Sequence, residues 1–433
     1  MKKKTLLKQV LEHQVFPALG CTEPVSVALC AAYAAKALGE PVKEALFLVD
    51  SGTFKNGMGV NIPNTGGGKG NLLAGALGAL IAKPELKMQI LSKSSPALLA
   101  AARKMVKSGA AKIEPVSGKK GIHIEARLSG AKNRAVCIIA ASHTHVTRLE
   151  KNAQVLINEK PEACQEQSYK KELAKETILS LAKLAAKADK DDLAYIRKGV
   201  EMNLAAAAAG SKMKKVGFYL KDLKKRGFLL DDVFSSSKIL TACATDARME
   251  GLPVPVMSSG ESGNQGIVAS LVPYNVGKAF KVPEKKILQS IALSHMLNAY
   301  VKVHTGGLAP ICGCAIAAGV GAAAAIVFQL RGPDNAAMSL AVNNLISDIG
   351  GMLCDGAKAG CALKVVSSTD AAIRSAYMGI HHYGITEVEG FVGRTAEDTI
   401  RNLASISTVG MQKVDPLIVN IMANKQNNRT CLS

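Results

Sequence analysis

The sequence predicts an α+β protein made of two unlike parts: an α+β domain with a largely antiparallel sheet, and a large all-α, Gly/Ala-rich helical domain. Three observations support this prediction. Segments rich in β-branched residues recur between residues 41 and 172. From residue 173 onward the pattern is almost wholly helical, and cysteines lie there within runs of Gly and Ala. We therefore divide the chain into residues 1–40, 41–172 and 173–433.

Residues 5–38 have a helical pattern that is interrupted at Cys21-Thr-Glu-Pro24. Thr22 can cap a second helix, and Pro24 can occupy one of its early positions. Cys21 would then lie just before the N-terminus of that helix, where the helix dipole lowers a thiol pKa and favours a thiolate. We expect the N-terminal helices of residues 1–40 to pack on the helical domain.

Residues 41–172 are expected to form the sheet domain. Apolar residues at helical spacing predict helices at Asn71–Ile81 and Ser95–Ser108. The expected strands are the segments in which β-branched residues alternate or run together: Ala45–Ser51, His123–Leu128, Arg134–Ala140, His145–Leu149 and Ala153–Asn158.

The helical domain contains one long uncharged stretch, Leu308–Leu330. It is mostly Ala and Gly, which supply little free energy of transfer into a membrane, and Pro310 and Gln329 interrupt it. We therefore expect a buried helix and no membrane span. The apolar core of a signal peptide is missing after Met1, so we expect a cytoplasmic protein with free thiols.

Composition argues against disorder and against nucleic-acid binding. Hydrophobic residues make up 48% of the 433 residues, which is typical of a globular protein. The net charge is +20, but the basic residues are scattered over helices and aromatic residues make up only 4%. We expect a small-molecule substrate and no nucleic acid, with a homodimer as an open possibility. Attraction of an anionic substrate would suit the positive charge.

Cys314, Cys354 and Cys361 are the strongest functional signal. Gly and Ala around them leave room for a bulky, soft cofactor, for which an iron–sulfur cluster is the natural candidate. Three thiolates would leave one iron of a [4Fe–4S] cluster open to substrate. The alternative is that they are buried small hydrophobic side chains. Zinc is less favoured, because the short Cys-x-x-Cys pair is absent.

Ser258–Gly266 is a Gly-rich segment before an apolar one. Its glycines allow backbone N–H groups to converge at a helix N-terminus, which suits a carboxylate; the Lys-Ser/Thr of a nucleotide-binding P-loop is missing. A simple helix-entry loop is the alternative. The expected substrate contacts are Ser259, Gly260, Gly263, Asn264 and Gln265.

His143 and His145 close a predicted strand. At positions i and i+2 they would point the same way and could bind a metal, although no third ligand is near in sequence. Edge histidines of a sheet are the commoner interpretation. Either residue could still orient a substrate carboxylate or donate a proton.

Taken together, the chain resembles the L-cysteine desulfidase family (UPF0597-type), which is related to the iron–sulfur L-serine dehydratase alpha chain. The resemblance covers nearly the whole sequence. It rests on ordered motifs: Gly20-Cys-Thr-Glu-Pro24, Phe54-Lys-Asn-Gly57, Ile62-Pro63, Ser142-His-Thr144, Asp246-x-x-Met249-x-Gly251, Gly263-Asn-Gln-Gly-Ile267, Cys312-Gly-Cys314, Gly351 to Lys358, and Gly360 to Lys364.

The resemblance implies a [4Fe–4S] enzyme that converts L-cysteine to pyruvate, ammonia and hydrogen sulfide. It implies Cys314, Cys354 and Cys361 as cluster ligands, with Cys312 able to replace Cys314. It also implies that Cys21 moves the α-proton, and His143 is a candidate substrate contact. Dehydration of L-serine by the same site is the alternative, and a cluster-binding sensor or a basic nucleic-acid-binding protein is the alternative from another class.

Overall fold

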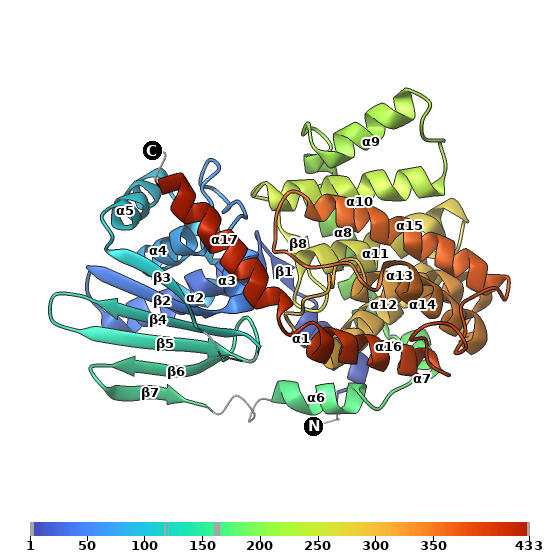
Figure 1. Cartoon of the computed structure of the whole chain (residues 1–433), viewed down its shortest axis with the longest axis horizontal. Coiled ribbons are helices and arrows are strands. Elements are labelled where there is room, and N and C mark those ends of the chain that lie inside the picture. Colours follow the sequence, from blue (N-terminus) through green and yellow to red (C-terminus); the bar gives the residue numbers. More distant parts are fainter. Residues whose placement is uncertain (1–3, 117, 120, 160–164, 431–433) are drawn as a thin grey trace.

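The computed structural model describes residues 4–116, 118–119, 121–159 and 165–430, and these form a sheet domain and a helical domain side by side (Figure 1). The sheet domain lies at the left of the view and the helical domain at the right. Helix α17 (Val414–Thr430) runs from one to the other. The predicted α+β class is confirmed.

Within the described residues, the main sheet has six strands in the order β3-β2-β4-β5-β6-β7. β2 and β3 are parallel, and the other neighbours are antiparallel. Buried residues alternate with more exposed ones along β2, β4 and β5, so one face of the sheet points into a core. The strands are β2 (Glu44–Asp50), β3 (Ala111–Val116), β4 (His123–Ser129), β5 (Arg134–Ala140), β6 (Val146–Lys151) and β7 (Gln154–Asn158).

The helices of the sheet domain cover that face, and they pack closely. A Cβ at Gly78 would lie 2.0 Å from the carbonyl oxygen of Ala28, so Gly is required where α4 meets α2. The helices are α2 (Thr22–Leu38), α3 (Ser51–Gly57), α4 (Asn71–Ile81), the 3₁₀ segment η1 (Pro84–Lys93) and α5 (Pro96–Lys107).

Helix α2 corrects one expectation. We expected all of residues 1–40 to pack on the helical domain, where α1 (Leu6–Gln14) does contact α12 (Glu284–Thr305). α2 instead lies in the core of the sheet domain, against α4, β4 and β5. Its side chains are buried almost all round, so the sequence has no polar stripe to indicate which domain it faces.

In the helical domain, α11, α12 and α15 pack around α13 (Ala317–Arg331). The residues of α13 from Ala317 to Gln329 are buried in that core. Among the described helices, none is long and apolar enough to cross a membrane. The remaining helices are α6 (Gln165–Leu173), α7 (Ile178–Ala186), α8 (Lys190–Gly210), α9 (Val216–Lys225), α10 (Val233–Met249), α11 (Gly263–Ala279), α14 (Asn335–Ile349), α15 (Cys361–Ile380), α16 (Ala396–Ser405) and the π-helical turn Ile406–Gly410.

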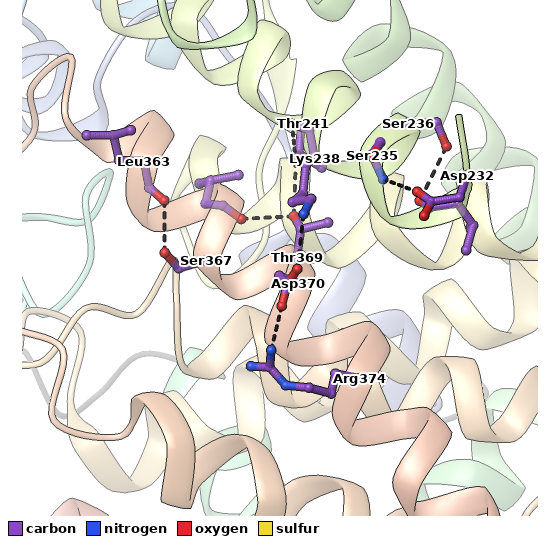
Figure 2. A network of polar contacts seen from close by, with 12 residues as sticks. Asp232, Ser235, Ser236, Lys238, Thr241, Leu363, Ser367, Thr369, Asp370 and Arg374 are labelled. Atoms are coloured by element: carbon purple, nitrogen blue, oxygen red, sulfur yellow. Dashed lines mark hydrogen bonds and ion pairs between the residues drawn. The ribbon is translucent and has the colours of Figure 1, made fainter. Parts of the chain in front are cut away.

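A polar network fixes α10 against α15 (Figure 2). Lys238 of α10 lies 3.1 Å from Asp370 of α15, which also accepts a hydrogen bond from Arg374 at 2.7 Å. The hydroxyls of Thr241 and Thr369 are 3.0 Å apart. α10 ends, and α15 begins, beside the cavity described below, so this network fixes the relative position of two of its walls.

Two contacts join the domains near the same cavity. The short strands β1 (Pro17–Ala18) and β8 (Val256–Met257) pair antiparallel. On α3, the buried Lys55 donates to the carbonyl oxygen of Cys354 at 2.8 Å and pairs with Asp415 of α17 at 2.7 Å. Lys55 therefore ties the sheet domain both to a cysteine loop and to the C-terminal helix.

Candidate active site

A cavity of about 80 Å³ lies where the N-termini of α2 and α11 meet the loops before α13 and α15. Both domains contribute to its walls. The predicted site residues that line it are Cys21, His143, Asn264, Gln265, Cys314, Cys354 and Cys361, together with Cys312.

Cys21 is the N-cap residue of α2 and donates a hydrogen bond from Sγ to Glu23 Oε2 at 3.2 Å. Thr22, the expected cap, is instead the first helical residue, and its hydroxyl also donates to Glu23. Burial, followed by the charge of Glu23, raises the pKa of the Cys21 thiol well above its ordinary value. The sequence predicted a thiolate at Cys21, but this environment favours the protonated thiol despite the helix dipole.

Glu23 accepts hydrogen bonds from three side chains at the N-terminus of α2 and on α3. It receives hydrogen bonds from Cys21, Thr22 and, at 2.9 Å, from Asn56 Nδ2. Burial raises its pKa, but the electrostatic interaction with the nearby His143 imidazole and the bond from Asn56 outweigh burial, and the net shift is downward. Glu23 is thus an ionised carboxylate beside a protonated thiol.

Arg248, on the last turn of α10, is a buried cation with unused donors. Its Nη1 donates to Asn264 Oδ1 at 3.0 Å, and the residue is 3% exposed. Its Nε and Nη2 have no hydrogen-bond partner among the residues that the structure describes. A buried guanidinium with free N–H groups beside a cavity is suited to a carboxylate, which accepts two parallel hydrogen bonds.

The Gly-rich segment forms the N-terminus of α11, as predicted, but only some of its residues line the cavity. Ser262 is the N-cap and makes no side-chain capping bond, while Gly263, Asn264 and Gln265 are the first three helical residues. The first N–H groups of a helix lack intrahelical partners and favour anions. A Cβ at Gly263 would lie 2.3 Å from Arg248 Nε, so this glycine leaves room for the guanidinium.

Ser259, Gly260 and Gly263, three predicted substrate contacts, do not line the cavity. The Ser259 hydroxyl lies 2.9 Å from His295 Nδ1 and accepts from Asn298 Nδ2 at 2.9 Å. The Gly260 carbonyl accepts a hydrogen bond from Lys302. Ser259 and Gly260 therefore attach the turn between β8 and α11 to helix α12.

His143 lines the cavity, whereas His145 does not. His143 Nδ1 lies 2.7 Å from Glu261 Oε2, and His145 Nε2 lies 2.9 Å from the exposed Glu159. The two histidines thus have different partners, which favours the interpretation as edge histidines over the metal pair considered from the sequence. Ala141 has a φ of 70°, in the left-handed region, which ends the strand before His143 and removes the i, i+2 geometry.

The cysteine loops are held together by their backbones. The N–H of Cys312 donates to the Met352 carbonyl at 2.8 Å, and the N–H of Cys354 donates to the Pro310 carbonyl at 2.7 Å. Cys361 is the first residue of α15. Three segments that are separate in sequence thus bring four interacting thiols to the lining of the cavity.

Burial raises the pKa values of Cys354 and Cys361, the latter to about 11. The hydrogen bond between Cys312 and Cys314 lowers the pKa of Cys312 and raises that of Cys314, so Cys312 ionises first. Positive charge is close to these thiols, since Lys55 bonds the Cys354 carbonyl and Lys364 bonds the Leu353 carbonyl. Cys312 and Cys314 are thus both candidate ligands at the cavity.

The residues present fit an iron–sulfur cluster better than a single metal ion. Within the described residues, no group of three or more His, Cys, Asp or Glu side chains converges closely enough for one ion. A cubane differs because each thiolate binds a different iron. Soft thiols from several segments, lined by Gly313, Gly356 and Ala357, provide that chemistry.

Four residues of this site were missed as functional in the sequence: Glu23, Arg248, Glu261 and Lys55. Three lie within the motifs quoted above, and Glu261 lies in the Gly-rich segment. Their signal was weak because charged residues in helical patterns usually lie on a solvated face. These residues are informative because they are buried with unpaired donors or in ion pairs, and only the three-dimensional structure shows this.

The chain matches the family model described as serine dehydratase alpha chain over residues 148–420. It is 59% identical over 420 residues to a UPF0597 protein of Elusimicrobium minutum, covering 97% of this chain and 99% of that protein. A UPF0597 protein of Geobacter sulfurreducens is 55% identical over 425 residues, with 98% and 99% covered. One of Clostridium tetani is 38% identical over 429 residues, with 99% and 100% covered.

Proposed function

Since this chain belongs to the serine dehydratase alpha chain family, we propose that it is a [4Fe–4S]-dependent L-cysteine desulfidase, a carbon–sulfur lyase. The reaction is an α,β-elimination that yields hydrogen sulfide, pyruvate and ammonia. One observation carries the proposal: a group of thiols and a buried arginine with free donors face the same small cavity. The first suits a soft metal cluster and a sulfur atom, and the second suits the carboxylate of an amino acid.

Cys314, Cys354 and Cys361 would hold the cluster, with Cys312 as the alternative to Cys314. When bound, a cluster with one open iron supplies a Lewis acid for the departing sulfur. The chain supplies the surroundings. The lysines at the cysteine loops would offset the negative charge of the thiolates.

Arg248 would bind the substrate carboxylate through Nε and Nη2. Asn264 holds the third nitrogen of the guanidinium, so the fork is oriented before substrate arrives. The free N–H groups at the start of α11 would add further donors on the same side. Positioning the carboxylate fixes Cα and Cβ relative to the thiol wall.

Cys21 would transfer a proton during the reaction. Because it holds its own proton at rest beside the Glu23 carboxylate, its first step is to give a proton rather than to take one. After elimination, 2-aminoacrylate needs a proton at Cβ to become the imine. Water then hydrolyses the imine to pyruvate and ammonia without enzyme groups.

L-Serine dehydration is the second candidate, favoured by the description of the family model. The same carboxylate site and proton donors would serve it. The two substrates differ at Cβ, where serine loses an oxygen, a harder leaving group. Carboxylate recognition at Arg248 therefore does not separate them, and turnover must be measured.

The test is anaerobic purification, reconstitution with iron and sulfide, and measurement of sulfide and pyruvate from L-cysteine, with L-serine in parallel. Equal amounts of sulfide and pyruvate from cysteine are expected. Pyruvate from serine alone would move the assignment to a dehydratase. A bound cluster with neither product would refute both and favour a sensor.

Variants separate the roles of the cysteines. Cys354→Ala should lose the cluster absorbance, whereas Cys21→Ala should keep it and lose turnover. Cys30→Ala is the matched control, since Cys30 is a buried thiol on the same helix as Cys21 and bonds the carbonyl of Cys137 outside the cavity. Normal turnover by Cys21→Ala would remove Cys21 from the mechanism.

A further inference from the structure

His143 and Glu261 form a buried acid–base pair on the wall of the cavity. His143 Nδ1 lies 2.7 Å from Glu261 Oε2, and the backbone N–H of His143 donates to the same oxygen at 3.3 Å. A carboxylate only accepts hydrogen bonds, so Nδ1 carries the ring hydrogen and Nε2 of the neutral ring keeps a lone pair. His143 is 3% exposed, and its Nε2 makes no hydrogen bond with any residue that the structure describes.

The surrounding backbone holds this geometry. Ser26 of α2 donates to the His143 carbonyl at 2.8 Å, which fixes the histidine loop to the helix that starts at Cys21. Glu261 has a φ of 63°, in the left-handed region that a residue with a long side chain rarely adopts. Such a conformation persists where its surroundings over-determine it. Here it accompanies a side chain directed at His143.

The charged groups that face the pair are Glu23 of α2, Lys170 of α6 and Lys302 of α12. Burial raises the pKa of Glu261, but the hydrogen bond and the electrostatic interaction with His143, followed by the ammonium groups of Lys170 and Lys302, outweigh burial, and the net shift is downward. Glu261 therefore stays ionised over the working pH range. The arrangement matches a histidine base whose tautomer is set by a carboxylate.

We propose that His143 Nε2 accepts the Cα proton of the substrate and that Glu261 is the positioning residue that orients the ring and sets its tautomer. This inference rests on the proposed elimination reaction and assigns its proton acceptor. It revises the expectation that Cys21 takes this proton. The thiol of Cys21 is already protonated, whereas Nε2 has a free lone pair and no partner to give up.

The step balances as an elimination. The Cα–H bond breaks and its proton moves to Nε2, while the electron pair of that bond forms the second bond between Cα and Cβ. The Cβ–S bond breaks, and sulfur leaves with the electron pair of the Cβ–S bond. The products are 2-aminoacrylate, sulfide and a protonated His143 whose charge Glu261 stabilises. The proton then returns to the departing sulfide, so no oxidant or reductant is needed.

The test compares His143→Gln and Glu261→Gln with the reconstituted full chain. General base catalysis contributes about 10²–10⁴-fold, so His143→Gln should lose that factor in kcat with little change in KM. Glu261→Gln should lose less, and the acid limb of its kcat/KM profile should move to lower pH, because the imidazolium loses its carboxylate. His145→Gln, outside the cavity, should behave as wild type.

Two readouts separate this proposal from the function on which it rests. Nitrogen-15 NMR of the apoprotein should show the Nδ1–H tautomer of His143, and this tautomer should be lost in Glu261→Gln. Finding the Nε2–H tautomer in wild type would refute the proposed roles of His143 and Glu261, and this measurement does not require an active enzyme. With substrate, wild type should show an isotope effect with α-deuterated cysteine or serine. If wild type eliminates either substrate and His143→Gln retains more than a third of its kcat, His143 is not the base, although the elimination stands.

Discussion

Arg248 and Gly263 are packed so closely that a methyl group at Gly263 would lie 2.3 Å from Arg248 Nε. Arg248 belongs to the end of α10 and Gly263 to the start of α11. The contact therefore links the buried cation to the helix N-terminus that shares its side of the cavity. It also means that the orientation of the guanidinium can be changed without altering any charge.

Gly263→Ala should impair substrate binding through this contact. The added methyl would also meet Val256 Cγ2 at 2.6 Å, so it cannot be relieved by moving away from Arg248. A displaced guanidinium should raise KM roughly tenfold or more, since small misplacements of positioning groups are costly. Steady-state kinetics checks this. Gly410→Ala, whose nearest neighbour is 4.0 Å away, is the control, and an unchanged KM in Gly263→Ala would argue against Arg248 as the carboxylate site.

Arg248→Lys should weaken binding of carboxylates specifically. Lysine keeps the charge but loses the fork, and hydrogen bonds to charged groups contribute about 1.5–3 kcal/mol each, so a loss on the order of 10–100-fold is expected. The measurement is inhibition by 3-mercaptopropionate, which has a carboxylate and a thiol, against cysteamine, which has the thiol without the carboxylate. The inhibition constant of the first should rise while that of the second stays constant. An equal change for both would place the carboxylate elsewhere.

The strands with strict alternation were predictable. The expected segments around β2, β4 and β5 agree with the structure within about two residues, because one face of each strand is buried and the other is not. β3 was missed. Its apolar residues alternate with Lys112 and Glu114 only as far as Pro115, and a proline within so short a run argues against a strand except at a sheet edge, where β3 lies.

The site was predictable in its residue types but not in its charges. Thiols and a Gly-rich helix start are local signals, and they do meet at one cavity. The state of Cys21 was not predictable, because it depends on burial and on Glu23 rather than on the helix dipole. The place of Arg248 depends on a contact between two helices, which no local pattern encodes.

Asp415→Ala should destabilise the docking of α17. Lys55 has a side chain that is 1% exposed, and it would be left as a buried cation with the Cys354 carbonyl as its acceptor. Removing one partner of a buried pair costs about 3–5 kcal/mol, and the partial exposure of Asp415 places the expectation at the lower end. Hydrogen exchange of the α17 amides measures the effect. Asp222→Ala, which breaks an exposed pair with Arg226, should cost less than about 0.5 kcal/mol.

The same change should reach the cysteine loop. If Lys55 loses its fixed position, the Cys354 carbonyl loses its donor, so reconstitution should yield less cluster per chain than in wild type. Iron content after reconstitution checks this against the Asp222→Ala control. Faster exchange in α17 with unchanged iron content would show that the helix and the cysteine loop are independent.

Asp246 should make stability fall as the pH rises. This residue is 2% exposed and accepts a hydrogen bond from the Gly217 N–H at 2.8 Å. Burial raises its pKa from 3.8 to about 6, despite backbone donors that lower it. Because the folded protein binds this proton more tightly than the unfolded chain, the contribution is fully present below about pH 4 and is lost as the pH rises through about 6.

Asp246→Asn cannot titrate, so its thermal midpoint relative to wild type should rise between pH 5 and pH 8. The partly exposed Lys215 and Glu250 nearby admit solvent screening, so the change should be on the order of 1–2 kcal/mol. Any constant cost of the amide cancels, because only the pH dependence of the difference is compared. Asp189→Asn is the control: the bond from Lys8 lowers the Asp189 pKa, so its difference from wild type should stay flat in this range. A flat difference for Asp246→Asn as well would mean that Asp246 is already ionised at pH 5.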